Sequence, residues 1–219
     1  MNKKVFFCVI LGIIIILSYL FFESTIQKIN MTINFCLSKI GMRKINFQKA
    51  EFEIKKLFGS DIKLPLENMQ LRILKSKRIL ELYNNGKLIK TYKIALGKES
   101  AGAKEIERDN KTPEGIYYIC TRNSKSKFDL FLGLNYPNKS DAEKAFQKKC
   151  ITKDIRQNIM EAEEKKECPP WNTSLGGSVG IHGGGNKPDW TAGCIALNDE
   201  DIVEIWMMSK KWTKVTIEK

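Results

Sequence analysis

The sequence predicts a mainly β domain with a few inserted helices, an α+β fold, preceded by an N-terminal transmembrane helix. Three observations lead to this prediction. Residues 5–22 carry no charge, residues from 70 onward show short runs of alternating apolar and polar side chains, and residues 139–149 and 154–166 are highly charged without β-branched runs. The first pattern is long enough to cross most of a bilayer core of roughly 30 Å, the second is typical of strands, and the third is typical of exposed helices.

The composition suits one folded domain with a short appendage. The chain has 219 residues, and 42% of them are hydrophobic, which is enough to fill a core and excludes global disorder. Lysine and arginine number 37 against 25 acidic residues, for a formal charge of +12. This surplus either solvates the surface or attracts an anionic partner. Nucleic acid is not expected, because the sequence has no zinc, helix-turn-helix or RNP pattern and the domain is expected outside the cytoplasm.

The charges beside the apolar segment orient the chain in the membrane. Lys3 and Lys4 precede the segment and Glu23 follows it, so the positive-inside rule places the N-terminus in the cytoplasm and the rest of the chain across the membrane. No A-x-A-like pattern follows the segment, which favours an uncleaved anchor over a signal peptide. We therefore expect an anchor at 1–22, a juxtamembrane stalk at 23–66 and the folded domain at 67–219.

The first part of the domain contains the clearest strand patterns. Residues 71–73 and 80–82 alternate apolar and charged side chains, and a return strand is expected over 88–96. Asn85-Gly86 precedes that return strand. This dipeptide is the strongest short hairpin signal, because both central residues of a type I′ turn need positive φ.

Strands and helices follow one another in the rest of the domain. Residues 139–149 and 154–166 predict one or two helices, and a last helix is expected over 199–209 with Asn198 as its N-cap. Further strands are expected over 116–119 (after a turn at 112–115), over 178–181 and around 215–217.

Two residues stand out as candidates for catalysis. His182 is the only histidine of the chain; it ends a predicted strand and precedes three glycines. Cys194 follows Gly193, and a cysteine nucleophile needs a base such as histidine and backbone N–H groups that hold the developing oxyanion. The alternative interpretation is a structural histidine and an inert core cysteine. Zinc is not expected, because one histidine without a C-x-x-C pair leaves too few ligands.

The motifs around these two residues resemble those of a known family. Residues 181–183 (Ile-His-Gly) and 191–195 (Thr-Ala-Gly-Cys-Ile) are similar to the H-G…[S/T]-x-G-C signature of the L,D-transpeptidase catalytic domain, or YkuD-like, family. Upstream, residues 111–117 resemble the T-P-x-G segment of this family, and residues 95–97 the end of the strand before it. Residues 134–138 look most like the YafK-like branch of Gram-negative envelope proteins. The resemblance covers roughly residues 68–219.

This resemblance implies a β-sandwich fold and a set of site residues. It makes Cys194 the nucleophile, His182 its base and Gly183 the residue whose carbonyl orients the imidazole. The resemblance assigns the oxyanion and the substrate to Gly193, Thr191, Asp189 and Trp190. Many members have histidine where this chain has Ala192 and arginine where it has Ala196. These departures leave the substrate and the acyl acceptor open.

The implied function is a cysteine-dependent L,D-transpeptidase that acts on peptidoglycan stem peptides through a thioester, in cell-wall biogenesis, remodelling or cell shape. Two alternatives are a hydrolase of the same fold, which cleaves stem peptides or detaches a lipoprotein, and a non-catalytic wall-binding module. No metal or organic cofactor is required. The expected partners are stem peptides, an envelope lipoprotein and the inner membrane, which the N-terminal helix crosses once with the domain on the periplasmic side.

The cysteines beyond the anchor suggest one disulfide. An oxidising compartment favours the pairing of accessible thiols. Cys150 and Cys168 bracket the charged insertion, so we expect these two to pair, or else to pack as small apolar residues. Cys194 must stay free if it is the nucleophile, Cys36 lies in the stalk, and Cys120 at the end of an apolar strand is expected to be a buried free thiol.

Overall fold

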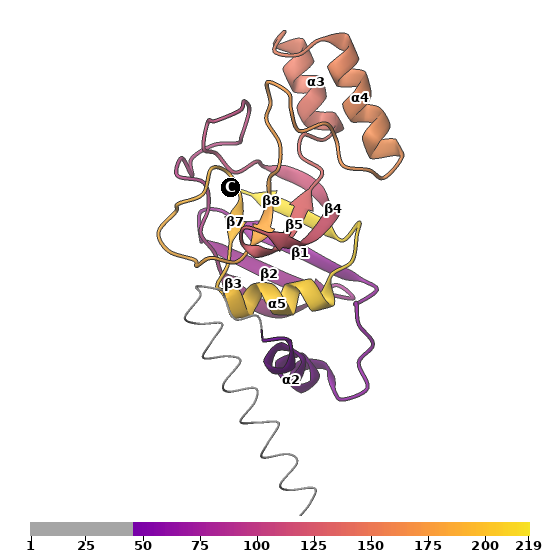
Figure 1. The fold of residues 1–219 in the computed structure, drawn as a ribbon, viewed down its shortest axis with the longest axis vertical. Coiled ribbons are helices and arrows are strands. Elements are labelled where there is room, and N and C mark those ends of the chain that lie inside the picture. Colours follow the sequence, from indigo (N-terminus) through magenta and orange to yellow (C-terminus); the bar gives the residue numbers. More distant parts are fainter. Residues whose placement is uncertain (1–45) are drawn as a thin grey trace, which may run out of the picture. The chain divides into compact units, whose positions relative to one another are not determined.

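The computed structural model describes residues 46–219 (Figure 1). The predicted anchor at 1–22 and the first part of the predicted stalk lie outside the described residues. Within the described part, no helix has both the length and the apolar character needed to cross a membrane.

In the part of the chain that the structure describes, eight strands form one mixed sheet in the order β3-β2-β1-β8-β4-β5-β6-β7. Antiparallel pairs predominate, and only β1–β8 and β6–β7 are parallel. The strands are β1 (Met69–Leu74), β2 (Ile79–Asn84), β3 (Lys87–Lys93), β4 (Gly115–Ser126), β5 (Asp129–Leu134), β6 (Gly180–His182), β7 (Ile195–Ala196) and β8 (Lys214–Glu218).

The expected β-sandwich is wrong in one respect, because the two halves belong to a single sheet. The 12-residue strand β4 pairs with β8 through its first part and with β5 through the rest of its length. Its register with β5 shifts between Ile119 and Thr121, and such bulges bend a strand. Ala95, just after β3, also bridges to Ala196 in β7, so the two ends of the sheet approach each other.

Local sequence signals predicted most of these elements correctly. Asn85 and Gly86 adopt φ values of 51° and 74°, which confirms the hairpin turn between β2 and β3. The strands around 116–119, 178–181 and 215–217 are confirmed as β4, β6 and β8. We did not predict β5, although it lies at the centre of the half of the sheet that carries the site.

The predicted helices are also confirmed. The charged insertion folds as α3 (Lys139–Gln147) and α4 (Lys153–Glu164), which pack on each other around a small apolar core that includes Ala142 and Ile159. Helix α5 (Asp199–Met208) begins after Asn198 and buries Ile202 and Ile205 in the main core. Figure 1 shows the pair α3–α4 at one end of the domain, with the strands between this pair and α5.

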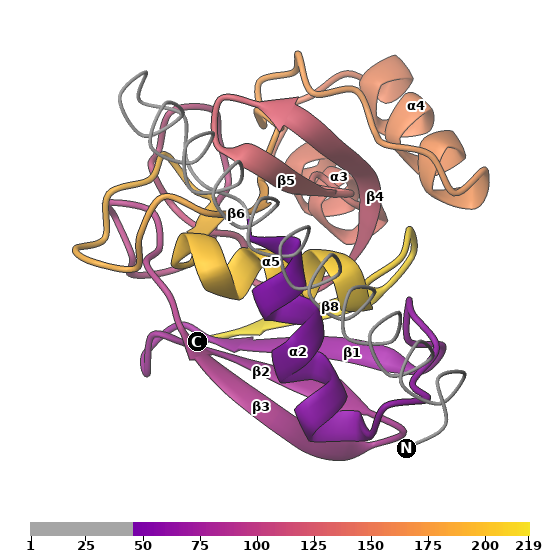
Figure 2. The ribbon, with the colours of Figure 1, turned by 60° about the horizontal axis from the view of Figure 1, so that its bottom comes forward.

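A further helix folds where we expected a stalk without its own core. Helix α2 (Phe47–Phe58) begins at Asn46, whose side chain accepts a hydrogen bond from Lys49 N, and lies across α5 (Figure 2). Ala50 and Ile54 belong to the main core cluster, and Ile54 is fully buried. Residues 47–66 therefore fold together with the domain.

The packing of α2 yields a stability prediction. Ile54→Ala should lower the free energy of unfolding by about 2–5 kcal/mol, because it removes a fully buried side chain and leaves a cavity. Phe52→Ala, on the exposed side of the same helix, should change it by less than about 0.5 kcal/mol. Urea denaturation of a fragment covering 45–219 measures both values, and equal losses in the two variants would contradict the packing.

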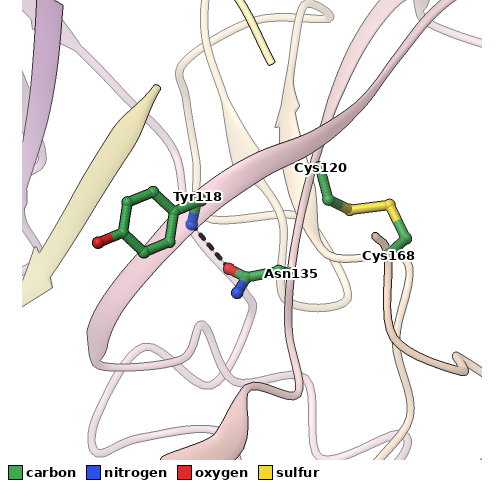
Figure 3. Close-up of a disulfide and its surroundings, with 4 residues drawn as sticks. All are labelled: Tyr118, Cys120, Asn135 and Cys168. Atoms are coloured by element: carbon green, nitrogen blue, oxygen red, sulfur yellow. Dashed lines mark hydrogen bonds between the residues drawn. A yellow bond between two sulfur atoms is a disulfide. The ribbon is translucent and has the colours of Figure 1, made fainter. Parts of the chain in front are cut away.

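The disulfide prediction is wrong in its partner. Cys168 pairs with Cys120, with a Cα–Cα distance of 5.2 Å (Figure 3). Cys150 is free and exposed. Cys120 lies at the register shift between Ile119 and Thr121 of β4. The extra residue of a bulge leaves the regular ladder, which explains why a cysteine in an apolar strand can face the chain that returns from α4. The bond ties that returning chain to the sheet.

Candidate active site

The sheet brings the two candidate catalytic residues to one place. His182 is the last residue of β6, and Cys194 immediately precedes β7. The two strands are parallel neighbours, with Ile181 opposite Ile195, so the loop over 183–194 leaves and re-enters the sheet at adjacent positions. His182 and Cys194 consequently line the same open groove, which we call the main groove.

The imidazole of His182 is held by its own backbone neighbour and by aromatic rings. Its Nδ1 lies 2.6 Å from the carbonyl oxygen of Gly183, which can only accept, so Nδ1 carries the proton and Nε2 is the basic nitrogen of the neutral ring. The ring of Phe128 stacks on the imidazole with centroids 3.9 Å apart, and Trp190 meets it edge-on at 5.6 Å. The ring is 1% exposed, so its orientation is fixed by packing as well as by hydrogen bonding.

Cys194 presents a neutral thiol to the groove. Its side chain is half-buried, and Sγ donates a weak hydrogen bond to the carbonyl oxygen of Ser178 at 3.5 Å. Burial raises the pKa of the Cys194 thiol above its ordinary value, while the Gly180 backbone and the charges of Lys127 and Lys104 act in the opposite direction. A thiolate at this position therefore requires a base that removes the proton.

Thr191 and Gly193 shape the turn that precedes the thiol. The Thr191 hydroxyl donates to the carbonyl oxygen of Cys194 at 2.7 Å and accepts from the N–H of Gly193 at 3.1 Å. The backbone of Thr191 pairs with that of Leu96 and Lys98. The N–H of Gly193, an expected oxyanion donor, thus already has an acceptor in this structure. The N–H of Cys194 is therefore the group that we expect to hold the oxyanion.

Gly193 has a steric reason to be glycine. Its φ is 134°, and a Cβ at this position would lie 2.6 Å from the carbonyl oxygen of Lys111. Gly183 is restricted in the same way, since its Cβ would meet the Asp199 carboxylate at 2.5 Å. Both turns that flank the groove therefore depend on close backbone approach.

Asp189 and Trp190, which the resemblance assigned to the substrate, both support the loop between the two candidate residues. One carboxylate oxygen of Asp189 accepts from Leu96 N at 2.9 Å, and the other accepts two hydrogen bonds from Arg78, at 3.0 and 2.8 Å. Trp190 donates through Nε1 to the carbonyl oxygen of Gly185 at 3.1 Å, and its ring lines the main groove. Asp189 thus holds the loop, whereas Trp190 both holds it and faces the groove.

The main groove continues into a second depression, which we call the side groove. Trp171, Gly177, Ser178 and Ala192 line both. Besides these shared residues, the main groove is lined by Asn123, Ser126, Lys127, Phe128, Phe131, Val179, His182, Trp190, Thr191 and Cys194. The side groove adds Lys104, Glu107, Arg108, Asn110 and Gly176.

Comparison with known families identifies the domain. The family described as the L,D-transpeptidase catalytic domain, YkuD, matches residues 70–217 of this chain. The chain belongs to this family. No curated protein sequence matches it.

Comparison with solved structures finds several of distant sequence that are similar to this L,D-transpeptidase domain. The helical cell shape determining protein Pgp2 from Campylobacter jejuni is 23% identical, with 80% of this chain and 56% of that chain covered and a TM-score of 0.46. Bd1075 from Bdellovibrio bacteriovorus is 21% identical (71% and 49% covered, TM-score 0.46). An L,D-transpeptidase from Xylanimonas cellulosilytica is 12% identical (71% and 63% covered, TM-score 0.41). The chain thus spans between 49% and 63% of these solved chains.

We did not predict the aromatic wall of the groove in this L,D-transpeptidase domain. Phe128 and Phe131 come from the β4–β5 hairpin, and Phe131 lies opposite His182 in the register of β5 and β6. Trp171 comes from the returning chain after Cys168. The run Lys127-Phe128 next to the apolar residues 130–132 was the available signal for this hairpin. Within residues 46–219, no group of three histidine, cysteine or acidic side chains is placed to hold a metal.

The charges near the thiol of this L,D-transpeptidase domain lead to a pH prediction. In a Cys150→Ser background, alkylation of Cys194 by iodoacetamide should accelerate with pH around a midpoint above that of an ordinary thiol, because burial favours the protonated form. Lys127→Gln removes a nearby positive charge and should shift the midpoint further upward. Lys125→Gln, two residues away and outside the groove, should leave it unchanged. A Lys127→Gln midpoint equal to that of the parent protein would contradict the electrostatic assignment.

Proposed function

We propose that this chain is a cysteine-dependent L,D-transpeptidase that acts on peptidoglycan stem peptides in cell-wall biogenesis or remodelling. The observation that carries the proposal is the placement of Cys194 and His182 in one open groove, with Nδ1 of the imidazole bound to the Gly183 carbonyl. Membership in the family supports the same chemistry. A thiol and an imidazole that line one groove can together generate a thiolate when substrate arrives, because the imidazole can take the thiol proton.

In the proposed reaction, Nε2 of His182 takes the thiol proton while Sγ of Cys194 attacks the carbonyl carbon on the L-centre side of an L–D peptide bond. The Cys194 N–H stabilises the oxyanion. The C–N bond then breaks, the leaving amine takes the proton from His182, and a thioester remains. An amine from a second stem attacks the thioester and gives a proton to His182. The C–S bond breaks, and the departing sulfur takes that proton from His182, which restores the thiol and the neutral imidazole.

Hydrolysis is the second candidate outcome. Cys194 is half-buried in an open groove, so water has a path to the thioester. With water as the acceptor, the products are a shortened stem and a free D-residue, or a lipoprotein detached from the wall. The same acyl-enzyme serves both outcomes, and only the acceptor differs.

We also propose that residues 1–22 anchor the protein in the inner membrane, with the domain in the periplasm. The uncharged segment at 5–22 and the lysines before it support this orientation. The Cys120–Cys168 bond also supports an oxidising compartment.

The test of the proposed function is covalent capture followed by product analysis. Incubation with a carbapenem should add one carbapenem mass to the peptide that contains Cys194, and a Cys194→Ala variant should gain none. Purified stem peptides should then give cross-linked products if the amine is the acceptor, or shortened peptides if water is. Absence of both the adduct and the products would favour a non-catalytic wall-binding module instead.

A further inference from the structure

The loop over residues 104–111 is built around one half-buried carboxylate. The side chain of Asp109 accepts from the N–H groups of Glu105, Ile106 and Lys111 at 2.8, 3.2 and 3.1 Å, and from Lys104 Nζ at 2.8 Å. Burial alone would raise the pKa of Asp109, but these donors outweigh it and lower the pKa below its usual range. The carboxylate is therefore ionised at neutral pH and holds the loop in one conformation.

This loop is fixed to the walls of both grooves. Glu107 N donates to the Ser174 carbonyl oxygen at 2.8 Å, on the chain that returns from the disulfide. At its other end, the carbonyl oxygen of Lys111 lies so close to Gly193 that a Cβ there would come within 2.6 Å of it. The loop thus positions its side chains relative to the turn that carries Cys194.

Arg108 is the residue that this rigid loop presents to the side groove. Its φ of 64° is unusual for a residue other than glycine, and such conformations persist where the surroundings enforce them. The side chain is exposed and lines the side groove with Ser178, whose carbonyl oxygen contacts Cys194 Sγ. Among residues 46–219, no side chain or backbone group forms a hydrogen bond or ion pair with the Arg108 guanidinium.

The charge balance of the two grooves favours an anionic ligand. Lys104 and Lys127 add positive charge, and Glu107 is the only acidic residue in the lining of either groove within the described part of the chain. Lys104 is already bound to Asp109 and the carbonyl oxygen of Ile106, so its ammonium is occupied. Arg108, in contrast, offers a planar pair of donors that matches a carboxylate.

We propose that Arg108 is a specificity-determining residue that binds the free α-carboxylate of the leaving D-residue of the substrate. This inference rests on the proposed function and assigns the leaving side of the substrate to the side groove. The carboxylate of that residue is separated from the scissile nitrogen by a single carbon atom. Ser178 and Ala192 line both grooves, so the carboxylate of a ligand with its scissile bond at Cys194 would bind close to these two residues. Arg108 lines the side groove with them, and its long side chain would have to reach the carboxylate there.

The test compares two stem peptides that differ only in the terminal group of the leaving D-residue, a free carboxylate or a carboxamide. The wild-type chain should prefer the free acid in kcat/KM by about tenfold or more, since a charge-assisted hydrogen bond of this kind contributes roughly a factor of 10 to 100. Arg108→Gln should bring the ratio between the two peptides close to one, and Arg108→Lys should restore part of it. Lys153→Gln, an exposed charge at the start of α4 and outside both grooves, should keep the wild-type ratio.

The outcomes separate this inference from the proposed function. If the wild type turns over both peptides and Arg108→Gln retains the wild-type preference, the assignment of Arg108 is wrong while the proposed function stands. If the wild type turns over neither peptide, the proposed function fails and the inference fails with it. Thermal unfolding and the iodoacetamide reactivity of Cys194 should match between Arg108→Gln and wild type. A loss of either would attribute the altered kinetics to a disturbed loop and would overturn the proposal.

Discussion

Replacing Cys194 with serine, or His182 with alanine, should reduce turnover of stem peptides by at least about 10⁴-fold. A serine hydroxyl in the same position is a far weaker nucleophile, because neutral imidazole removes its proton much less readily than that of a thiol. His182 is the only histidine of the chain, so no other imidazole can take over its role. When two groups act as a unit, the second loss adds little, and the double variant should be hardly slower than either single variant.

Initial rates with purified stem peptides measure these losses. Cys150→Ser removes the other free thiol of the described chain and should retain wild-type rates. Because His182 is 1% exposed and stacks on Phe128, alanine also removes packing there. His182→Gln fills more of that space, and circular dichroism of both variants separates lost chemistry from lost structure. Substantial turnover by a well-folded His182 variant would rule out the proposed base.

Gly193→Ala should have the second-largest effect, with a loss of about 100-fold in kcat and about 1–3 kcal/mol of stability. The added Cβ would lie 2.6 Å from the Lys111 carbonyl oxygen, so the Gly193–Cys194 turn or the 104–111 loop has to move. The φ of 134° adds backbone strain. A displacement of about 1 Å at a nucleophile is enough for a loss of this size.

Gly185→Ala is the matched control for this prediction. Gly185 also has a positive φ, 106°, but a Cβ there would meet nothing within 4 Å. This variant should lose a similar amount of stability from backbone strain and far less activity. Thermal unfolding and stem-peptide turnover of both variants provide the comparison, and similar activity losses in the two would show that contact with Lys111 is unimportant.

Much of the fold could be predicted because its signals are local. The Asn85-Gly86 turn, the charged helices α3 and α4, and the start of α5 after Asn198 each depend on side chains within a few residues. The family motifs likewise led to the positions of His182 and Cys194. We did not predict strand β5, because it follows β4 after a turn that contains neither glycine nor proline.

The contacts that shape the site could not be predicted, because they join distant parts of the chain. Phe128 reaches His182 only because β5 pairs with β6 across about fifty residues of sequence. Asp189 precedes the catalytic motif, yet its partner is Arg78, in the turn between β1 and β2. The pairing of Cys120 with Cys168 depends on a bulge in β4, and the residues around Cys120 contain no pattern that predicts this bulge.

The Cys120–Cys168 bond also links the shape of the candidate active site to the oxidation state of these two cysteines. One wall of both grooves is the chain between Cys168 and β6, which contains Trp171 and Ser178 and has no helix or strand of its own. The disulfide secures the start of that wall to β4 (Figure 3). A chain whose thiols are still reduced lacks this covalent attachment, and noncovalent contacts such as the hydrogen bond from Glu107 N to the Ser174 carbonyl oxygen would then have to hold the wall. The shape of both grooves would thus depend on the redox state of a cysteine pair that takes no part in the proposed chemistry.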